Sequence, residues 1–455
     1  MALRLLFLHP NFPGQFGQLA AALAARPDFE VLAIGHRGAD GRMVPGVKVH
    51  YYDAFPWVEH SAFAGTEQFT QQVRRGRAAR QVLQDIKHDG FRPDIVIAHP
   101  GWGDAMFLHD IFPDARLISF MEFYYKRTGT DLDFDPEFPS DPSEVEFLRL
   151  RNLPSVMAYE VSAAAVSPTH WQANLFPPAI RSGISVVHEG IDTSGIRPDP
   201  AARLPLPSGR VLGRGDEVLT YVSRGLEPLR CFHSFMRALP EIQQRRPNAF
   251  TVIVGSDKAH YGKRPPVAAS WREALLAELK GSLDLSRIWF AGRLPYADYL
   301  DVLRVSSVHA YLTYPFVLSW SLLEAMSAGC AIVGSRTAPV EEAILDEVTG
   351  VLADPLQPSD IAARIIALLS DQPRRRELGR AARQHAEIHY DFQLIGLPGY
   401  LDLFDRVMKR CGPGIVEPLH VVGGESSTPG PSIAAENHRE RRTENLEADV
   451  GRTLE

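Results

Sequence analysis

The chain has 455 residues, of which 45% are hydrophobic and 23% charged, an ordinary composition for soluble globular domains. Its net charge of -7 argues against duplex nucleic acid as the main partner, because phosphate binding requires a basic face. Three scattered cysteines are too few for a disulfide framework or a zinc cluster, and no apolar run approaches the length of a bilayer span. We therefore predict a cytoplasmic protein.

Short apolar runs in the first half of the chain predict a parallel, doubly wound sheet. Helix-length or loop stretches separate these runs, and such alternation is typical of βαβ units. A proline-rich stretch at about 193–213 offers little that could pack, so we expect it to link a first domain, 1–195, to a second. The predicted strands are Leu5 to Leu8, Val31 to Ile34, Val47 to Tyr51, Ile95 to Ala98, Leu117 to Phe120, Ala163 to Val166 and Ile184 to His188.

The second half repeats this pattern and predicts a second parallel sheet in a domain spanning 213–392. Spaced apolar residues then predict a terminal helix at about 393–410. Beyond it, Gly, Pro, Ser, Glu and Arg dominate residues 412–455, with too few apolar residues to offset the entropy of ordering, so we expect a disordered tail. The predicted strands are Leu219 to Val222, Thr251 to Val254, Ile288 to Phe290, Val308 to Leu312 and Ala331 to Val333.

Two arginines, Arg224 and Arg230, lie between a predicted buried strand and a predicted helix. In open α/β sheets, ligands collect at the carboxyl ends of strands, beside helix N-termini that attract anions. Arginine forks match phosphate oxygens bidentately. The pair therefore predicts a diphosphate site, although a surface turn with two solvated arginines is the plainer alternative.

The arginine pair, together with the later Leu323-Glu324-Ala325-Met326-Ser327-Ala328-Gly329, resembles the retaining family 4 glycosyltransferases, or glycosyl transferases group 1, and the likeness spans roughly residues 3 to 410. The resemblance implies the GT-B fold, an α/β arrangement of two Rossmann-like domains facing across a cleft. It makes the first domain the acceptor domain, with the terminal helix returning to it, and the second the nucleotide-sugar donor domain. In that family an Arg and a Lys hold the donor diphosphate, and Arg230 stands at the Lys position.

Glu324 is predicted at the start of a helix, where its carboxylate would lie near the positive helix end. The resemblance assigns it to the nucleotide ribose, as the second glutamate of an E-x7-E pattern. The first glutamate falls at Phe316, and this departure puts the sugar and the activity in doubt. The neighbouring Leu318, Ser319 and Trp320 are still expected to offer amides or hydroxyls to the donor.

Further donor contacts are expected at strand ends and in a glycine-containing loop. Gly255 and Arg293 follow predicted strands around which relatives bind the nucleotide. Gly14 and Gly17 follow the first strand without forming the GxGxxG fingerprint, so a nicotinamide cofactor is poorly supported, and a plain tight turn is the alternative.

His99 follows a predicted strand, where its ring would face the cleft between the domains; the resemblance implies a functional histidine here, and we predict a catalytic role in which the imidazole hydrogen-bonds a sugar hydroxyl near the reacting carbon. Its alternative role is a loop histidine that caps a backbone group. Trp102 would supply an apolar wall for a sugar face, and Glu122 and Tyr124 would line the acceptor side.

The run Asp131-Leu132-Asp133-Phe134-Asp135 superficially matches a DxD metal motif, whose carboxylates hold Mg or Mn against a diphosphate. It lies in an acidic, proline-rich loop, and the arginine pair already supplies countercharge. We therefore predict a solvated or acceptor-facing loop and no metal. Arg74 to Arg80 form a basic cluster that suits peripheral contact with an anionic inner membrane face, or simply a solvated helix face.

The resemblance thus implies transfer of a hexose from a nucleoside diphosphate sugar to a glycan, lipid, small-molecule or protein acceptor, with retention and without cofactor or metal. Two alternatives stay open. Phe316 is the reason to consider a catalytically silent GT-B protein that binds a nucleotide or glycan. A GT-B sugar-nucleotide epimerase or phosphorylase is the other.

Overall fold

The computed structural model describes residues 2–38, 43–53, 56, 61–63, 65–141, 145–410, 415, 417 and 418. Apart from 415, 417 and 418, the tail predicted at 412–455 lies outside these residues. Among the helices described, none combines the length and the apolar character needed to cross a bilayer.

The first predicted sheet is confirmed as seven parallel strands in the order β3-β2-β1-β4-β5-β6-β7. Leu6 and Leu8 contribute to the core on one face and Leu5 and Phe7 to the core on the other, because successive side chains of a strand point to opposite faces. The strands are β1 (Leu3–Leu8), β2 (Phe29–Arg37), β3 (Lys48–Asp53), β4 (Ile95–Ala98), β5 (Arg116–Phe120), β6 (Ala164–Ser167) and β7 (Ile184–Val186).

Helices cover both faces of this sheet, as a fully buried parallel sheet requires. Leu83 of α2 packs with Leu6, and Leu19 of α1 packs with Leu5. The helices of this domain are α1 (Gly17–Ala24), α2 (Glu67–His88), α3 (Leu108–Ile111), α5 (Leu148–Glu160), α6 (His170–Leu175) and α7 (Pro178–Arg181), with 3-10 turns η1 (Gly14–Phe16) and η2 (Pro100–Trp102).

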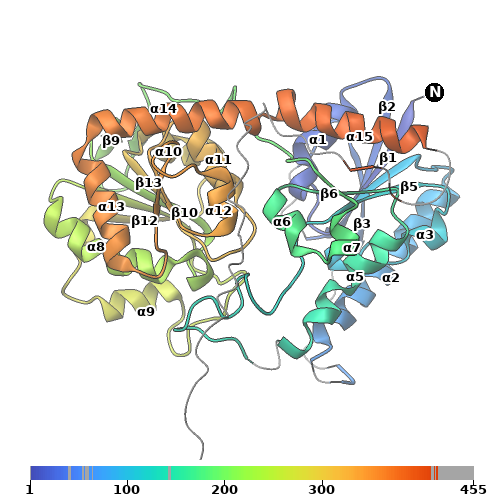
Figure 1. The fold of residues 1–455 in the computed structure, drawn as a ribbon, viewed down its shortest axis with the longest axis horizontal. Coiled ribbons are helices and arrows are strands. Elements are labelled where there is room, and N and C mark those ends of the chain that lie inside the picture. The colour runs from blue at the N-terminus through green and yellow to red at the C-terminus, as the bar shows by residue number, and fades with distance from the viewer. Residues whose placement is uncertain are drawn as a thin grey trace, which may run out of the picture. The chain divides into compact units, whose positions relative to one another are not determined.

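The second sheet is also parallel, with the order β12-β11-β10-β13-β14-β15. Its strands are β10 (Val218–Gly225), β11 (Phe250–Ser256), β12 (Ile288–Gly292), β13 (Val308–Tyr311), β14 (Ile332–Ser335) and β15 (Val351–Ala353). Its helices are α8 (Phe232–Arg245), α9 (Trp271–Glu278), α10 (Tyr296–Val305), α11 (Trp320–Ser327), α12 (Ala338–Ala343), α13 (Pro358–Ser370) and α14 (Gln372–His389), with 3-10 turns η3 (Pro228–Arg230) and η4 (Leu285–Arg287). Two similar α/β domains therefore follow each other along the chain (Figure 1).

The expectation that residues 193–213 pack little is wrong. They contain an antiparallel hairpin of β8 (Arg203–Pro205) and β9 (Val211–Gly213). Leu204 and Leu212 are buried in one cluster with Val218 and Phe250 of the second sheet. The alternating leucines bury one face of the hairpin. Its prolines lie where the backbone N–H is not needed for a hydrogen bond between the two strands.

The terminal helix α15 (Leu397–Lys409) lies with the first sheet, where the resemblance places it; a π-helical turn, η5 (Phe392–Gly396), precedes it. Tyr400, Leu403 and Phe404 are buried in the cluster that contains Leu5 and Phe7 of β1. Pro398 is tolerated because it occupies the first turn, whose amides need no helical acceptor. Figure 1 shows α15 beside α1 and β1.

Candidate functional site

Arg224 and Arg230 lie at or just after the carboxyl end of β10, and both approach the same aromatic ring. Arg224 is the next-to-last residue of the strand, and Arg230 lies in η3. Their guanidinium carbons lie 5.8 and 5.9 Å from the ring centroid of Tyr261, and Arg224 donates a hydrogen bond to the Tyr261 hydroxyl. The two cationic groups therefore converge on one place instead of pointing to opposite surfaces.

The two arginines differ in burial. Arg224 is exposed, whereas Arg230 is 7% exposed and donates from Nη1 to the Thr313 hydroxyl at 2.9 Å and to the Val317 carbonyl at 3.3 Å. The position of Arg230 is thus fixed by the loop that precedes α11. A buried, preorganised guanidinium loses little entropy when it binds an anion, so Arg230 is the stronger candidate for holding phosphate.

Glu227, which our sequence analysis did not single out, fixes Tyr261 over the arginine pair. Its carboxylate is fully buried and accepts hydrogen bonds from the backbone amides of His260, Tyr261 and Gly262 at 2.9 to 3.3 Å. The Glu227 carboxylate thus holds the loop after β11 against the turn after β10.

The glycines named from the sequence differ in what the fold requires of them. A Cβ on Gly255 would lie 2.8 Å from the Ser223 carbonyl, so glycine lets the ends of β10 and β11 approach. Gly14 has φ +48°, and a Cβ there would lie 2.7 Å from the His9 ring. Gly17 has an ordinary helical conformation and only loose neighbours, so it reads as the first residue of α1.

Phe316, at the position of the usual glutamate, belongs to an aromatic cluster next to Arg230. Its ring centroid lies 5.0 Å from that of Phe123 and 5.3 Å from that of Tyr261, and the Arg230 guanidinium lies 5.5 Å from it. Phe316 is 7% exposed. A buried ring beneath a guanidinium thus occupies the place where a carboxylate was expected.

Glu324 is not at the start of its helix, contrary to our prediction. α11 begins at Trp320, and no acidic residue lies in its first turn. The Glu324 carboxylate is therefore not held by the helix end. Its two oxygens accept hydrogen bonds from the Tyr296 and Tyr299 hydroxyls, at 2.7 and 2.6 Å. Glu324 is therefore a fixed, partly buried acceptor next to the first turn of α10.

The residues at the N-terminus of α11 have separate roles. The Ser319 hydroxyl caps the helix by accepting from the Ser321 amide, and the Ser319 amide donates to the Tyr311 hydroxyl. Leu318 packs against the core of the second domain. Trp320 donates its indole N–H to Glu189 of the first domain at 2.8 Å, so a contact between the domains already uses it.

On the first domain, the buried His99 and the partly buried Glu122 form a pair at the carboxyl ends of β4 and β5. His99 Nε2 lies 3.0 Å from Glu122 Oε2, and Gln15 donates to the other carboxylate oxygen. Burial alone would raise the pKa of Glu122, but the charge of His99 and the hydrogen bonds from His99 and Gln15 outweigh it and lower the pKa. His99 Nδ1 is buried without a partner among the described residues, so this histidine does not cap a backbone group.

His9 connects the His99–Glu122 pair to the glycine-containing loop, because its ring lies next to both His99 and Gly14. The His9 and His99 rings meet edge to face with centroids 5.3 Å apart, and burial followed by the charge of His99 lowers the pKa of His9 well below its usual value. The predicted residues Gly14, His99 and Glu122 are thus brought together. His9 was missed because it precedes the loop and had no partner visible in the sequence.

Trp102, Tyr124 and Arg293 lie at the margins of these groups. Trp102 is 37% exposed with the Arg75 guanidinium 5.3 Å from its ring, so one arginine of the basic cluster packs on it. Tyr124 packs on Phe176, which makes it largely structural. Arg293 is exposed and follows β12. Its charge reaches the neighbouring loop, because burial first, and then the charges of Arg224 and Arg293 among others, lower the pKa of His260.

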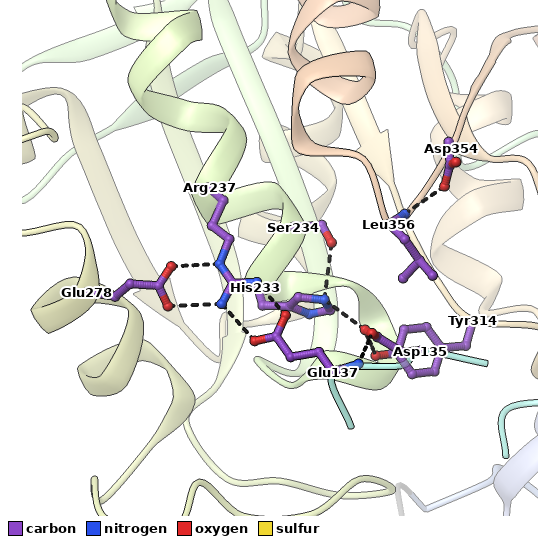
Figure 2. A network of polar contacts seen from close by, with 9 residues as sticks. All are labelled: Asp135, Glu137, His233, Ser234, Arg237, Glu278, Tyr314, Asp354 and Leu356. Atoms are coloured by element: carbon purple, nitrogen blue, oxygen red, sulfur yellow. Dashed lines mark hydrogen bonds and ion pairs between the residues drawn. The ribbon is translucent and has the colours of Figure 1, made fainter. Parts of the chain in front are cut away.

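Residues 121–141, called here the docking segment, leave the end of β5 and pack on the second domain. The expectation of a solvated loop at Asp131 to Asp135 is therefore wrong for Asp135, which is buried. Phe123, Phe134 and Phe138 pack against the core of the second domain. Asp135 is 5% exposed; its carboxylate accepts from Tyr314 and lies 3.0 Å from His233 Nε2 (Figure 2).

The polar contacts of the docking segment form a network with α8. Burial alone would raise the pKa of Asp135, but hydrogen bonds from His233 and Tyr314 outweigh it, so the pKa is lowered. Glu137 makes a bidentate pair with Arg237, which also binds Glu278 (Figure 2). Ligand atoms of Asp135, Glu137 and His233 are close enough to surround a cation. Because tyrosine, arginine and backbone donors already bind these carboxylates, we interpret the cluster as an ion-pair network.

Comparison with known proteins agrees with this arrangement. Residues 27–196 match the family described as "Glycosyl transferase family 4 group", and residues 210–385 match "Glycosyl transferases group 1". The first match falls on the first sheet and the second on the second sheet. The chain belongs to the family 4, group 1 glycosyltransferases.

The glycosyltransferase is similar to curated proteins over part of their length. It is 28% identical over 203 residues to a D-inositol 3-phosphate glycosyltransferase of Segniliparus rotundus, covering 45% of this chain and 43% of that protein. It is 26% identical over 221 residues to a glycogen synthase of Mycobacterium tuberculosis, covering 49% and 48%. The glycosyltransferase thus spans about half the length of the curated relatives it matches.

Solved structures show the same fold at low identity. HepE of Anabaena, in complex with UDP and glucose, is 16% identical with a TM-score of 0.62, over 89% of this chain and 100% of that one. Sucrose-phosphate synthase from Thermosynechococcus elongatus is 16% identical with a TM-score of 0.66, over 89% and 99%. The predicted GT-B fold is therefore confirmed.

Proposed function

We propose that the glycosyltransferase moves a hexose from a nucleoside diphosphate sugar to a hydroxyl-bearing acceptor, with retention at the anomeric carbon and without a metal. The observation that carries this proposal is the convergence of Arg224 and Arg230 on Tyr261 at the carboxyl end of β10. Two guanidiniums at such a strand end, one buried and preorganised, suit a diphosphate better than any other common ligand.

The proposed chemistry is electrostatic. As the bond between the sugar and the diphosphate lengthens, negative charge grows on the leaving phosphate, and Arg224 and Arg230 stabilise that charge. This countercharge is the reason to propose metal independence. Glu324, held by two tyrosine hydroxyls, is the candidate acceptor for ribose hydroxyls of the nucleotide.

The donor we favour as a first probe is a UDP-hexose, because the structurally similar HepE of Anabaena was solved with UDP and with UDP-glucose. His99 and Glu122 are placed on the acceptor side of the reaction in this proposal. The Glu122 carboxylate fixes the imidazole, and the partnerless Nδ1 is the group that would meet a sugar hydroxyl.

A panel of UDP-, GDP-, ADP- and dTDP-hexoses tests the proposal. One donor should raise the melting temperature and be hydrolysed slowly without acceptor, in the presence of EDTA, to the same anomer as the donor. Mass spectrometry then identifies the acceptor. Inversion of the anomer, or loss of turnover with EDTA that Mg²⁺ restores, would contradict retention or metal independence respectively.

A catalytically silent nucleotide- or glycan-binding protein is the second candidate, and the burial of Phe316 favours it. The place of a donor-contacting carboxylate is filled by a ring packed between Phe123 and Tyr261. This candidate predicts measurable nucleotide binding with no hydrolysis or transfer for any donor in the panel. Turnover of any donor excludes it.

A further inference from the structure

The docking segment carries a carboxylate that the proposed mechanism does not use. Asp131 lies between two points at which the segment is fixed. At one, the amide and carbonyl of Tyr125 form a reciprocal pair of hydrogen bonds with the Asn152 side chain, at 2.8 and 2.9 Å. At the other, Asp135 binds Tyr314 and His233 of the second domain. Asp131 is therefore held in a defined position.

One oxygen of this carboxylate has no partner. Asp131 Oδ1 is buried and accepts no hydrogen bond from any described residue. A buried carboxylate oxygen that is left unsatisfied is unfavourable, so its persistence calls for a ligand or a functional role. Neighbouring Asp133, by contrast, is exposed and accepts from the Ser140 amide.

The surroundings of Asp131 are those of the candidate site. Burial raises the pKa of Asp131 to about 6, and hydrogen bonds from its own backbone amide and from the Thr130 side chain, together with the charges of Arg151 and Arg230, act against that rise. Asp131 in turn raises the pKa of Tyr125, after burial, and Arg151 lies 5.5 Å from the Tyr125 ring. The segment that carries the orphaned oxygen also carries Phe123, which packs on Phe316 next to Arg230, in a region where Phe316 supplies no carboxylate.

We propose that Asp131 binds a substrate hydroxyl, accepting a hydrogen bond at Oδ1. The hydroxyl belongs either to the transferred sugar or to the acceptor, and this inference rests on the proposed function. An anionic group is excluded as its ligand, because Asp131 would repel it. The docking segment then contributes a specificity-determining residue from the first domain to a site built on the second.

The test compares Asp131→Asn, which keeps the side-chain size and removes the charge, with Asp133→Asn as a control in the same segment. Calorimetry gives the affinity for the nucleoside diphosphate and for its hexose conjugate, using the pair selected by the donor panel. Asp131→Asn should bind the nucleoside diphosphate at least as tightly as the wild type does, because removing a nearby negative charge does not weaken the binding of an anion. Asp133→Asn should change nothing.

The two sources of the hydroxyl give different results. If the donor sugar supplies it, the conjugate binds about 10-fold more weakly to Asp131→Asn. If the acceptor supplies it, donor affinity is unchanged and the KM for the acceptor rises about 10-fold. Equal weakening of diphosphate and conjugate, or no change in any of these quantities, overturns the inference. A wild-type protein that binds no nucleoside diphosphate refutes the proposed function instead, and the inference with it.

Discussion

Phe123 of the first domain packs against Phe316 of the second, with ring centroids 5.0 Å apart. The residue that departs from the family pattern is thus also a contact between the domains. Because Arg230 lies 5.5 Å from the same ring, the aromatic cluster supports the guanidinium proposed to hold the donor diphosphate. The phenylalanine at 316 has aromatic neighbours to pack against, which include Tyr261 and the docking segment.

Phe316→Ala should lower the free energy of unfolding by about 3 kcal/mol, because it opens a cavity between Phe123, Tyr261 and Arg230. Urea denaturation measures this loss. Phe316→Leu, which fills more of the space, serves as the control and should lose less. Equal stability of Phe316→Ala and the wild type would mean that the cluster does not pack as described.

Arg230→Ala should weaken nucleoside diphosphate binding by about 2 to 5 kcal/mol, because its charged contact is buried. Arg224→Ala should cost about 1 kcal/mol or less, since an exposed charge is screened by solvent. Calorimetry measures both affinities, and Arg406→Ala on α15 is a control that removes an arginine elsewhere. Unchanged affinity in both site variants would reject the proposed phosphate contact.

Asp135→Ala should lower the free energy of unfolding by about 3 kcal/mol, because it leaves His233 and Tyr314 buried without their shared acceptor. Glu137→Gln disrupts a more exposed pair with Arg237 and should cost about 1 kcal/mol or less. Chemical denaturation of both variants provides the comparison. A smaller loss for Asp135→Ala than for Glu137→Gln would show that the docking segment is held by something else.

Stability should fall as the pH is lowered from 7 to 5, and His309 should account for part of the fall. This histidine is fully buried beside the Thr220 hydroxyl, and burial lowers its pKa to about 3. Below the unfolded value of about 6.5, the unfolded chain takes up a proton that the folded protein excludes, which removes about 2 kcal/mol by pH 5. The stability is present above the unfolded pKa and is lost below it.

Urea denaturation of His309→Asn at pH 7 and pH 5 checks the sign. The variant should lose less stability between the two pH values than the wild type, whatever its stability at pH 7. A remaining dependence is expected from His385, whose pKa burial lowers to about 4. His88→Asn, on an exposed helix end, should keep the wild-type dependence.

The central strands of both sheets were predictable from sequence because they are short apolar runs buried on both faces, as Ile95 to Ala98 illustrates. The short strands β8, β9 and β15, of three residues each, were not predicted. The arginine pair was predictable because its position depends on the end of one of the central strands. Tyr261, Glu227 and Asp135 were not, because their roles depend on partners distant in sequence; Tyr314 lies 179 residues from Asp135. The position of Glu324 in its helix was predicted wrongly, because α11 begins at Trp320, one turn before Glu324.

The packing of α15 has a consequence for synthesis of the chain. Tyr400, Leu403 and Phe404 share a buried cluster with Leu5 and Phe7, so the earliest and latest segments of the described fold complete one core. A nascent chain that has emerged from the ribosome only to residue 390 exposes the apolar surface that α15 covers. The first domain therefore reaches its native packing only after α15 has been synthesised, and chaperone demand should be highest before that point.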